Sequence, residues 1–167
     1  IGTLPYEIVS PYSQDDLDEI KFTQSADILY LTHPDYQTRK LSRTGHTAFS
    51  FSTLDAIDGP WGGINTTSTT FAASGTTGSV TITASAVTGI NNNTGFQTTD
   101  VGRHIRLLRT GKWGAGKITA RASTTSVTVQ TFTDFDFGDT TATTNWRLGI
   151  WSDTTGWPTT ATFYQQR

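Results

Sequence analysis

Residues 22–51, FTQSADILYLTHPDYQTRKLSRTGHTAFSF, carry the signals of two consecutive β-hairpins. Ala26–Leu31 is a strand-like run that ends before Pro34, because proline has no N–H to give to a strand ladder. Arg39–Arg43 runs back to a Thr-Gly turn, and Thr47–Phe51 then alternates apolar and polar side chains. Strands linked in this way by short turns are typical of one blade of a β-propeller.

Two phrases at opposite ends of the chain resemble one family. The first is QSADILYLTHPDYQTRKLSRTGHTAF, residues 24–49, and the second joins Trp151–Pro158 to Ala161–Arg167. Both resemble phrases of bacteriophage tail tubular protein B and of related tail nozzle proteins, and together they cover about a quarter of the chain. A third phrase, Phe96–Leu107, resembles the F-x-x-x-D-V-G-R-x-I-R-L pattern of barrel-like insertions in these proteins.

The composition narrows the classes of function. A net charge of −2 and the lack of a basic block argue against sequence-specific nucleic-acid binding, which needs a positive surface. No run approaches the roughly 20 apolar residues of a membrane-spanning helix. The chain has no Cys, which excludes disulfides, thiolate metal sites and cysteine nucleophiles and fits assembly in a reducing cytoplasm.

The two ends of the sequence indicate a piece of a longer protein. The chain contains no Met, begins Ile-Gly-Thr and stops at Arg167 within an apolar run. A C-terminal Arg is what a trypsin-like cut leaves, and a boundary chosen by hand is the alternative. In the resembled family the chain continues here into a further strand.

The first part of the chain offers one helical signal. Leu4–Ser10 is expected to form a short edge strand. Ser13 and Asp16 make a capping-box-like start, and the acidic residues around them favour a helix N-terminus, so we expect a short helix that lasts to about Ile20. Asp55–Gly63, DAIDGPWGG, is rich in turn residues and is expected to be a linker.

The composition changes at Asn65, with 28 Thr from Thr66 to the end and 7 before it. Thr is β-branched and suits half-exposed strands. Apolar and polar residues alternate in five places, whose apolar members are Val80, Ile82 and Ala84; Ile105 and Leu107; Ile118 and Ala120; Val127 and Val129; and Trp146, Leu148 and Ile150. Five or six short strands separated by turns predict a small barrel or sandwich, and the alternation argues against disorder of a Thr-rich segment.

Taken together, these signals predict an all-β fold: a partial β-propeller-like sheet with an inserted small β-barrel or sandwich. The expected division assigns residues 1–63 and 157–167 to the propeller-like segment and residues 64–156 to the insertion. The chain is then expected to leave the first sheet near Trp61 and to rejoin it near Trp157.

One glycine-rich motif resembles a nucleotide site. Gly111–Ile118, GKWGAGKI, has the G-x-x-x-x-G-K of a phosphate-binding loop. That loop needs a Ser or Thr next, and a helix that begins there. Here the next residue is Ile118 and the pattern beyond it is a strand. We therefore predict a glycine-rich hairpin, with Trp113 over one end of the barrel, and no nucleotide or other cofactor.

The histidines and the aspartates offer two weaker candidates. His33, His46 and His104 form no H-x-H or H-x-x-x-H pair, and local roles in turns and at strand edges are expected rather than metal or catalytic ones. Asp35 is expected to cap backbone N–H groups of the turn that follows His33. Asp134–Asp139, DFDFGD, lacks ligands that a calcium loop requires, so a hairpin is preferred and an incidental calcium site is the alternative.

The tryptophans are the remaining candidates for a site. Trp146 and Trp157 are expected to be anchors in a core or an interface. Trp113 and Trp151 are the candidates for contact with a neighbouring protein or a glycan, since exposed Trp rings pack at interfaces and stack on sugars. No G-x-S-x-G motif is present, and two converging carboxylates cannot be recognised from spacing alone. We predict that the chain is not an enzyme.

The resemblance implies a structural role. The parent protein is expected to be a component of a phage virion tail, in a tube, nozzle or head–tail connection, that forms part of the DNA-ejection channel wall. Its implied partners are other tail proteins and further copies in a homo-oligomeric, six-fold ring, around double-stranded DNA that passes without specific binding. Assembly would take place in the cytoplasm of the host bacterium.

The alternative is a carbohydrate-binding module of a tail appendage that recognises the host surface. The placement of the tryptophans distinguishes the two. Several coplanar exposed rings beside Asp or Asn would favour sugar binding, whereas rings buried in the barrel or in a subunit seam would favour the structural role.

Overall fold

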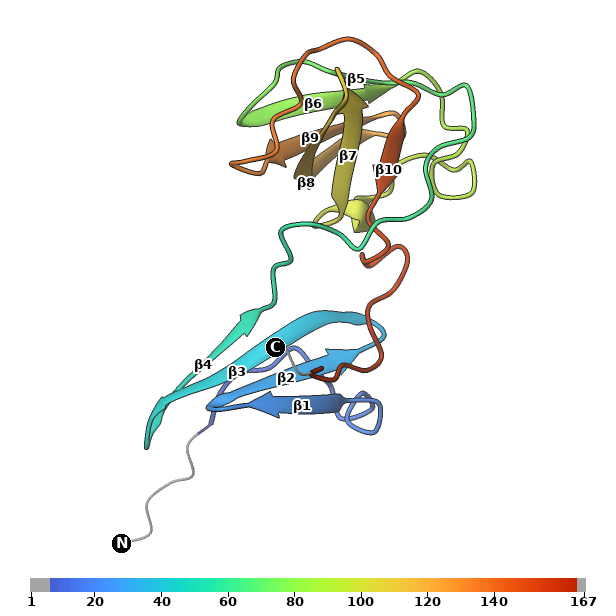
Figure 1. The fold of residues 1–167 in the computed structure, drawn as a ribbon. Helices are drawn as coiled ribbons and strands as arrows, with labels where there is room; N and C mark the ends of the chain where they lie inside the picture. Colours follow the sequence, from blue (N-terminus) through green and yellow to red (C-terminus); the bar gives the residue numbers. More distant parts are fainter. Residues whose placement is uncertain (1–6, 165–167) are drawn as a thin grey trace, which may run out of the picture. The chain divides into compact units, whose positions relative to one another are not determined.

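The computed structural model describes residues 7–164, which fold into two compact units (Figure 1). Unit 1 combines the residues up to Asp55 with those from Gly156 onwards, and unit 2 is Ala56–Thr155. Strands make up 43% of the structure, and the described residues contain no α-helix. The chain is therefore all-β, as its sequence predicts.

Unit 1 is a four-stranded antiparallel sheet in the order β1-β2-β3-β4. Its strands are β1 (Lys21–Ser25), β2 (Ile28–His33), β3 (Tyr36–Gly45) and β4 (Ala48–Thr53). The two predicted hairpins are confirmed. The first turns at Pro34–Asp35, and the second turns at His46–Thr47 and not at the predicted Thr44-Gly45, because β3 runs on to Gly45. The strand β1 was not predicted, and it makes a third hairpin whose turn holds Ala26 at a φ of 49°.

The segment that begins at Gly156 returns to unit 1 beside β2. The Trp157 N–H donates to the carbonyl oxygen of Pro34 at 2.8 Å, and Thr32 Oγ1 donates to the carbonyl oxygen of Thr159 at 3.2 Å. The ring of Phe163 meets that of Tyr30 edge-on, with 5.3 Å between the centroids. Unit 1 is thus built from two parts of the chain that are separated by all of unit 2.

Unit 2 is a curled six-stranded antiparallel sheet, a half-barrel, in the order β10-β7-β8-β9-β6-β5 (Figure 1). Its strands are β5 (Phe71–Ala73), β6 (Ser79–Ala84), β7 (His104–Arg109), β8 (Lys112–Ser123), β9 (Ser126–Thr131) and β10 (Trp146–Leu148). Phe71 on β5 forms a backbone bridge with Thr143, just ahead of β10. Because β5 and β10 are the two edges of the sheet, this bridge brings them together.

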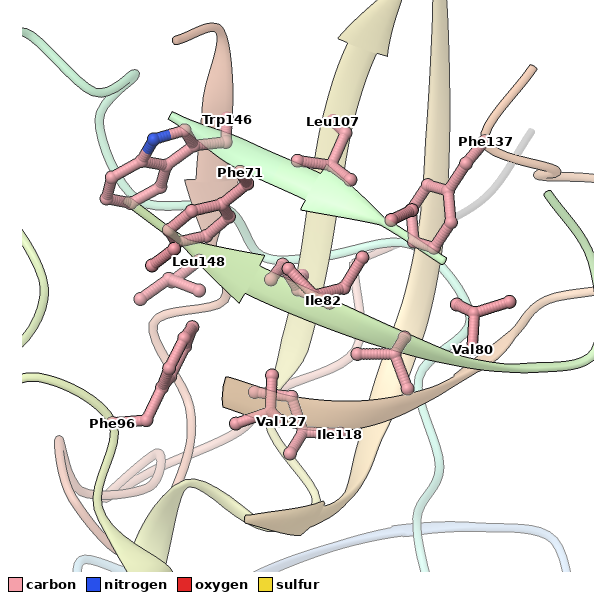
Figure 2. Packing of buried hydrophobic residues seen from close by; sticks show 14 of the residues in the cluster. Phe71, Val80, Ile82, Phe96, Leu107, Ile118, Val127, Phe137, Trp146 and Leu148 are labelled. Atoms are coloured by element: carbon pink, nitrogen blue, oxygen red, sulfur yellow. The ribbon is translucent and has the colours of Figure 1, made fainter. Parts of the chain in front are cut away.

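The core of unit 2 lies inside the curled sheet. Phe71 stacks on Trp146 with 4.1 Å between ring centroids and 8° between planes (Figure 2). The Trp146 Nε1–H donates to the carbonyl oxygen of Thr69 at 2.9 Å, so the one polar atom of this buried ring is satisfied. Around this pair lie the other large buried apolar residues, Val80, Ile82, Ile90, Phe96, Ile105, Leu107, Ile118, Val127, Val129, Phe137 and Leu148.

The phrase Phe96–Leu107 has a structural explanation. Asp100 and Arg103 are both buried, with 2.9 Å between Oδ1 and Nη1. Asn91 completes the network, because its Nδ2 donates to Asp100 Oδ2 and its Oδ1 accepts from Arg103 Nη1. Gly102 sits between the charged residues at a φ of 94°, a conformation that favours glycine.

Three expectations for the first part of the chain differ from the structure. The predicted helix from Ser13 to Ile20 is a series of turns, in which Asp16 N donates to Ser13 O and Glu19 N to Asp16 O, three residues apart. A helix this short is costly to nucleate, and the Asp16 carboxylate is instead bound by Ser13 and Tyr36. Of the expected strand Leu4–Ser10, residues 4–6 lie outside the described residues and residues 7–10 form no strand.

The boundary between the units falls at Asp55, earlier than the expected one at Gly63. The segment 56–63 joins unit 2, because Gly62 N–H donates to the Leu148 carbonyl oxygen at 2.9 Å and Trp61 bridges to Gly149. At the other end, Gly156 belongs to unit 1.

Two apolar residues of unit 2 do not face the core as their alternation predicts. Ala120 is exposed, because the register of β8 shifts between Ile118 and Ala120 and turns the alternation over. Ile150 lies beyond the end of β10 and is 45% exposed. The short strand Phe71–Ala73 was not predicted.

Candidate functional site: an arginine and tryptophan stack

The most unusual surface of unit 2 lies on the face of the sheet opposite to the core. Along β7, Ile105, Leu107 and Arg109 are buried, so the alternate residues point the other way. Arg106 is among these, and its direct partner across the β10–β7 ladder is Arg147. Two arginines therefore stand opposite each other on neighbouring strands, which is an unfavourable pairing unless other groups compensate.

Aromatic rings provide that compensation. The Arg106 guanidinium carbon lies 4.6 Å from the ring centroid of Trp61 and 4.4 Å from that of Trp113. Arg147 lies 5.5 Å from the Trp113 ring. Contacts at these distances are cation–π interactions, worth about 0.5–1 kcal/mol each at exposed sites. We call Trp61, Arg106, Trp113 and Arg147 the Arg/Trp stack.

The polar groups of the two arginines find no acceptor in the described part of the chain. Among residues 7–164, neither Arg106 nor Arg147 makes a hydrogen bond or an ion pair, and the Nε atom of each is buried. Burial lowers the pKa of Arg106, the nearby Arg147 lowers it further, and Asp58 acts in the opposite direction. Each guanidinium carries five N–H donors, so the stack presents unsatisfied donors on a half-buried surface.

The neighbouring residues hold the stack in place. The Trp61 Nε1–H donates to Asp58 Oδ1 at 2.7 Å, which fixes the plane of the ring. His104 lies next to Trp61, with 6.0 Å between ring centroids, and meets Phe132 edge-on at 5.1 Å. This face of the sheet is thus lined by aromatic and cationic side chains in contact.

The structure separates the two tryptophans that the sequence singles out. Trp113 lies on the sheet against Arg106 and not over one end of the barrel, because it pairs with Leu108 on the face away from the core. Trp151 is half-buried after β10 and is not part of the stack. Trp146 lies in the core, which is one of the two roles expected for it. Trp157 is half-buried in unit 1.

The glycine-rich motif Gly111–Ile118 is a hairpin, as predicted. Thr110 and Gly111 form the turn, both with positive φ, and β8 begins at Lys112. Gly114 and Gly116 leave no room for a Cβ, because the backbones of Asp136 and Gln130 approach them closely. The glycines therefore serve close packing of the chain.

The turn after His33 is capped by the His33 side chain, whereas the predicted capping residue was Asp35. The Asp35 backbone N–H donates to His33 Nδ1 at 3.1 Å, so the imidazole caps the turn and the Asp35 carboxylate does not. His33 is buried, and its Nε2 lies 3.9 Å from Asp16 Oδ1 and 4.0 Å from Glu19 Oε2 without a hydrogen bond. Sequence spacing did not show these acidic neighbours, because Asp16 and Glu19 come close to His33 only where the turn Ser13–Glu19 folds back against it.

Asp134–Asp139 is a loop and not the predicted hairpin, because Asp136 and Asp139 bind backbone N–H groups two residues further on. Asp136 accepts from Lys112 Nζ at 2.8 Å and from the Gly138 N–H at 2.8 Å, and both contacts lower its pKa. Asp139 accepts from the Thr141 N–H. No group of three or more His, Cys, Asp or Glu side chains suited to a metal ion occurs in the described part of the chain.

The arginines of the stack were not among the candidates from sequence. The alternation places Arg106 and Arg147 on the outer face of two strands, but only the β10–β7 register shows that they are opposite each other.

Within residues 7–164 there is also no helix with the length and apolar character to cross a membrane.

Comparison with known proteins adds no relative. Neither protein-family models nor curated protein sequences gave a match to the chain.

Proposed function

We propose that this chain is part of a structural component of a bacteriophage tail and forms part of the wall of the DNA-ejection channel. The observation that carries the proposal is the insertion itself. The chain leaves the four-stranded meander of unit 1 after β4 and forms the whole of unit 2. Gly156 and the residues after it then return to β2. A propeller-like sheet with an inserted barrel is the organisation that the resemblance to tail tubular and nozzle proteins implies.

The chemistry of the described surfaces supports a structural role. The buried polar network around Asp100 and Arg103 is satisfied within the protein and ties loops to strands. Short Thr-rich strands and turns fixed by their own side chains suit a rigid wall. A net charge of −2 suits a channel from which DNA must be released.

The carbohydrate-binding alternative is less well supported by the tryptophans. Trp146 is buried in the core, and Arg106 lies against the rings of both Trp61 and Trp113. A sugar needs an open ring face to stack on, and a guanidinium occupies a face of each of these rings. We therefore retain the structural role as the proposed function.

Immunogold electron microscopy tests the proposal. Antibodies raised against residues 7–164 are applied to phage particles purified from a culture that expresses the full-length parent protein. Gold at the tail or at the junction of head and tail is the expected result. Unlabelled particles, with the parent protein recovered only from the particle-free fraction, would refute the proposal.

A further inference from the structure

The Arg/Trp stack has the chemistry of a site for carboxylates. Arg106 and Arg147 face each other without an acceptor among the described residues, although each guanidinium has a fork of N–H donors that fits a carboxylate. The negative charge of Asp58 acts on Arg106, but Asp58 Oδ1 already accepts a hydrogen bond from Trp61 Nε1. A carboxylate from another molecule would relieve the repulsion between the two arginines and accept hydrogen bonds from their accessible Nη groups, whereas both Nε atoms are buried.

The geometry favours an acidic protein segment over an acidic sugar. The rings of Trp61 and Trp113 are already in contact with Arg106, so their faces hold the guanidinium in a fixed plane. What remains to be satisfied is the hydrogen-bonding edge of the two arginines. Pairs of Asp or Glu side chains present carboxylates at a spacing that two neighbouring guanidinium groups can accept.

A complementary segment exists on unit 1 of the same chain. The turn Asp15–Glu19, DDLDE, carries four acidic residues, of which Asp15, Asp18 and Glu19 are exposed. Asp15 and Asp18 make no ion pair among the described residues. Asp16 gives the turn a fixed shape, because its Oδ2 accepts from Ser13 N, Ser13 Oγ and Tyr36 Oη within 2.8 Å.

We propose that the Asp15–Glu19 turn of one copy binds the Arg/Trp stack of a second copy. The contact rests on the proposed function, in which copies of the parent protein assemble together. Each copy carries both surfaces, so two copies can make the contact reciprocally in a closed pair, or successive copies can make it head-to-tail until a ring closes.

Sedimentation velocity of the chain tests this contact. The wild type is expected to self-associate as its concentration rises to about 1 mM, with weaker association at high salt. The variant D15K/D18K changes two exposed side chains and is expected to weaken association about tenfold or more. The variant R106E/R147E should lose association to the same degree.

A mixture of the two variants gives the sharpest readout. Each variant alone presents like charges at both surfaces, but D15K/D18K keeps a native stack and R106E/R147E keeps a native turn. Equimolar mixing is therefore expected to restore association. The matched control, E7K/D27K, reverses the charge of two exposed side chains elsewhere on unit 1, so it changes the net charge as much as D15K/D18K does and should leave association unchanged.

Three results would overturn the proposal. One is a wild type that stays monomeric throughout the concentration range, and another is a D15K/D18K variant that associates like the wild type. The third is binding of polygalacturonate that requires Arg106 and Arg147, without self-association, which would assign the stack to an acidic glycan. Labelled phage tails together with a monomeric chain would refute this contact alone and leave the proposed function standing.

Discussion

Asp100 and Arg103 form an ion pair that is buried on both sides, with 2.9 Å between Oδ1 and Nη1. Four further hydrogen bonds complete it. Gln97 N and Asn91 Nδ2 donate to the carboxylate, Arg103 Nε donates to the Gly149 carbonyl oxygen, and Arg103 Nη1 donates to Asn91 Oδ1. The pair thereby links the loop before β7 to the end of β10.

The first prediction concerns this pair. Asp100→Ala leaves the Arg103 charge buried without its partner and is expected to cost unit 2 about 3–5 kcal/mol of unfolding free energy. Denaturant titration followed by fluorine NMR of fluorotryptophan-labelled protein measures the loss at Trp146. The control is Asp136→Ala, which breaks the exposed contact with Lys112 and should change stability far less. Equal losses of unfolding free energy in the two variants would show that burial gives the Asp100–Arg103 pair no extra contribution to stability.

Two glycines provide a matched pair for the second prediction. Gly95 and Gly102 both have positive φ, 79° and 94°. A Cβ at Gly95 would lie 2.5 Å from the Thr124 carbonyl oxygen, whereas a Cβ at Gly102 meets no atom within 4 Å. Gly102→Ala should therefore cost about 1 kcal/mol through backbone strain alone. Gly95→Ala should cost clearly more stability. Thermal unfolding of both variants and of the wild type measures the two losses, and a larger loss for Gly102→Ala would contradict the prediction.

The third prediction is a pH dependence of unit 1. Hydrogen bonds from Ser13 and Tyr36 lower the pKa of Asp16 below its ordinary value of 3.8. A lowered folded-state pKa adds stability that is present above the unfolded-state pKa and is lost as the pH falls through the folded-state pKa. Unit 1 is thus expected to lose stability as the pH falls below about 4. Asp16→Asn should remove this part of the acid sensitivity and lower the stability at neutral pH.

Trp157 lies in unit 1, so its fluorotryptophan resonance reports this acid transition separately from unit 2. Tyr36→Phe removes one donor and should raise the pKa of the Asp16 carboxyl, measured by carbon NMR of the side chain. Asp18→Asn is the control, because no hydrogen bond to the Asp18 carboxylate is found within residues 7–164. An acid transition identical in wild type and Asp16→Asn would contradict the prediction.

The fourth prediction follows from the proposed channel. With a net charge of −2, the chain should bind double-stranded DNA no more tightly than about 10⁻⁴ M at physiological salt. Fluorescence anisotropy with a labelled duplex measures this affinity. Between about 50 and 200 mM salt the weak signal should change little, because few phosphates are neutralised. Tight binding that collapses over this range would instead indicate a nucleic-acid-binding surface.

Much of the fold could be predicted from local sequence. The β2–β3 hairpin follows from the turn chemistry of Pro34, and the core residues of β6, β7 and β9 follow from strict alternation. Ser13–Ile20 shows the limit of such signals: its capping contact forms between Ser13 and Asp16, but tertiary bonds from Tyr36 hold the segment in turns. Ala120 shows another limit, since a single register shift reverses which face is buried.

The candidate site depended on pairing that no local pattern contains. Trp113 was recognisable as a surface aromatic, but its partner Arg106 comes from β7 and Arg147 comes from β10. The strands β8, β7 and β10 are neighbours in the sheet although Arg147 follows Trp113 by more than thirty residues. Trp151 is close to Arg147 in sequence and yet not part of the stack, because the chain leaves the sheet after β10.

The insertion of unit 2 between Asp55 and Gly156 also sets the path of mechanical force through the molecule. Tension applied between residues 7 and 164 enters unit 1 at both ends, and the bonds of Trp157 and Thr159 to β2 carry it across that unit. Unit 2 is loaded only after those bonds break. The half-barrel is therefore shielded from pulling, and a force–extension experiment should record the opening of unit 1 first and the extension of unit 2 second.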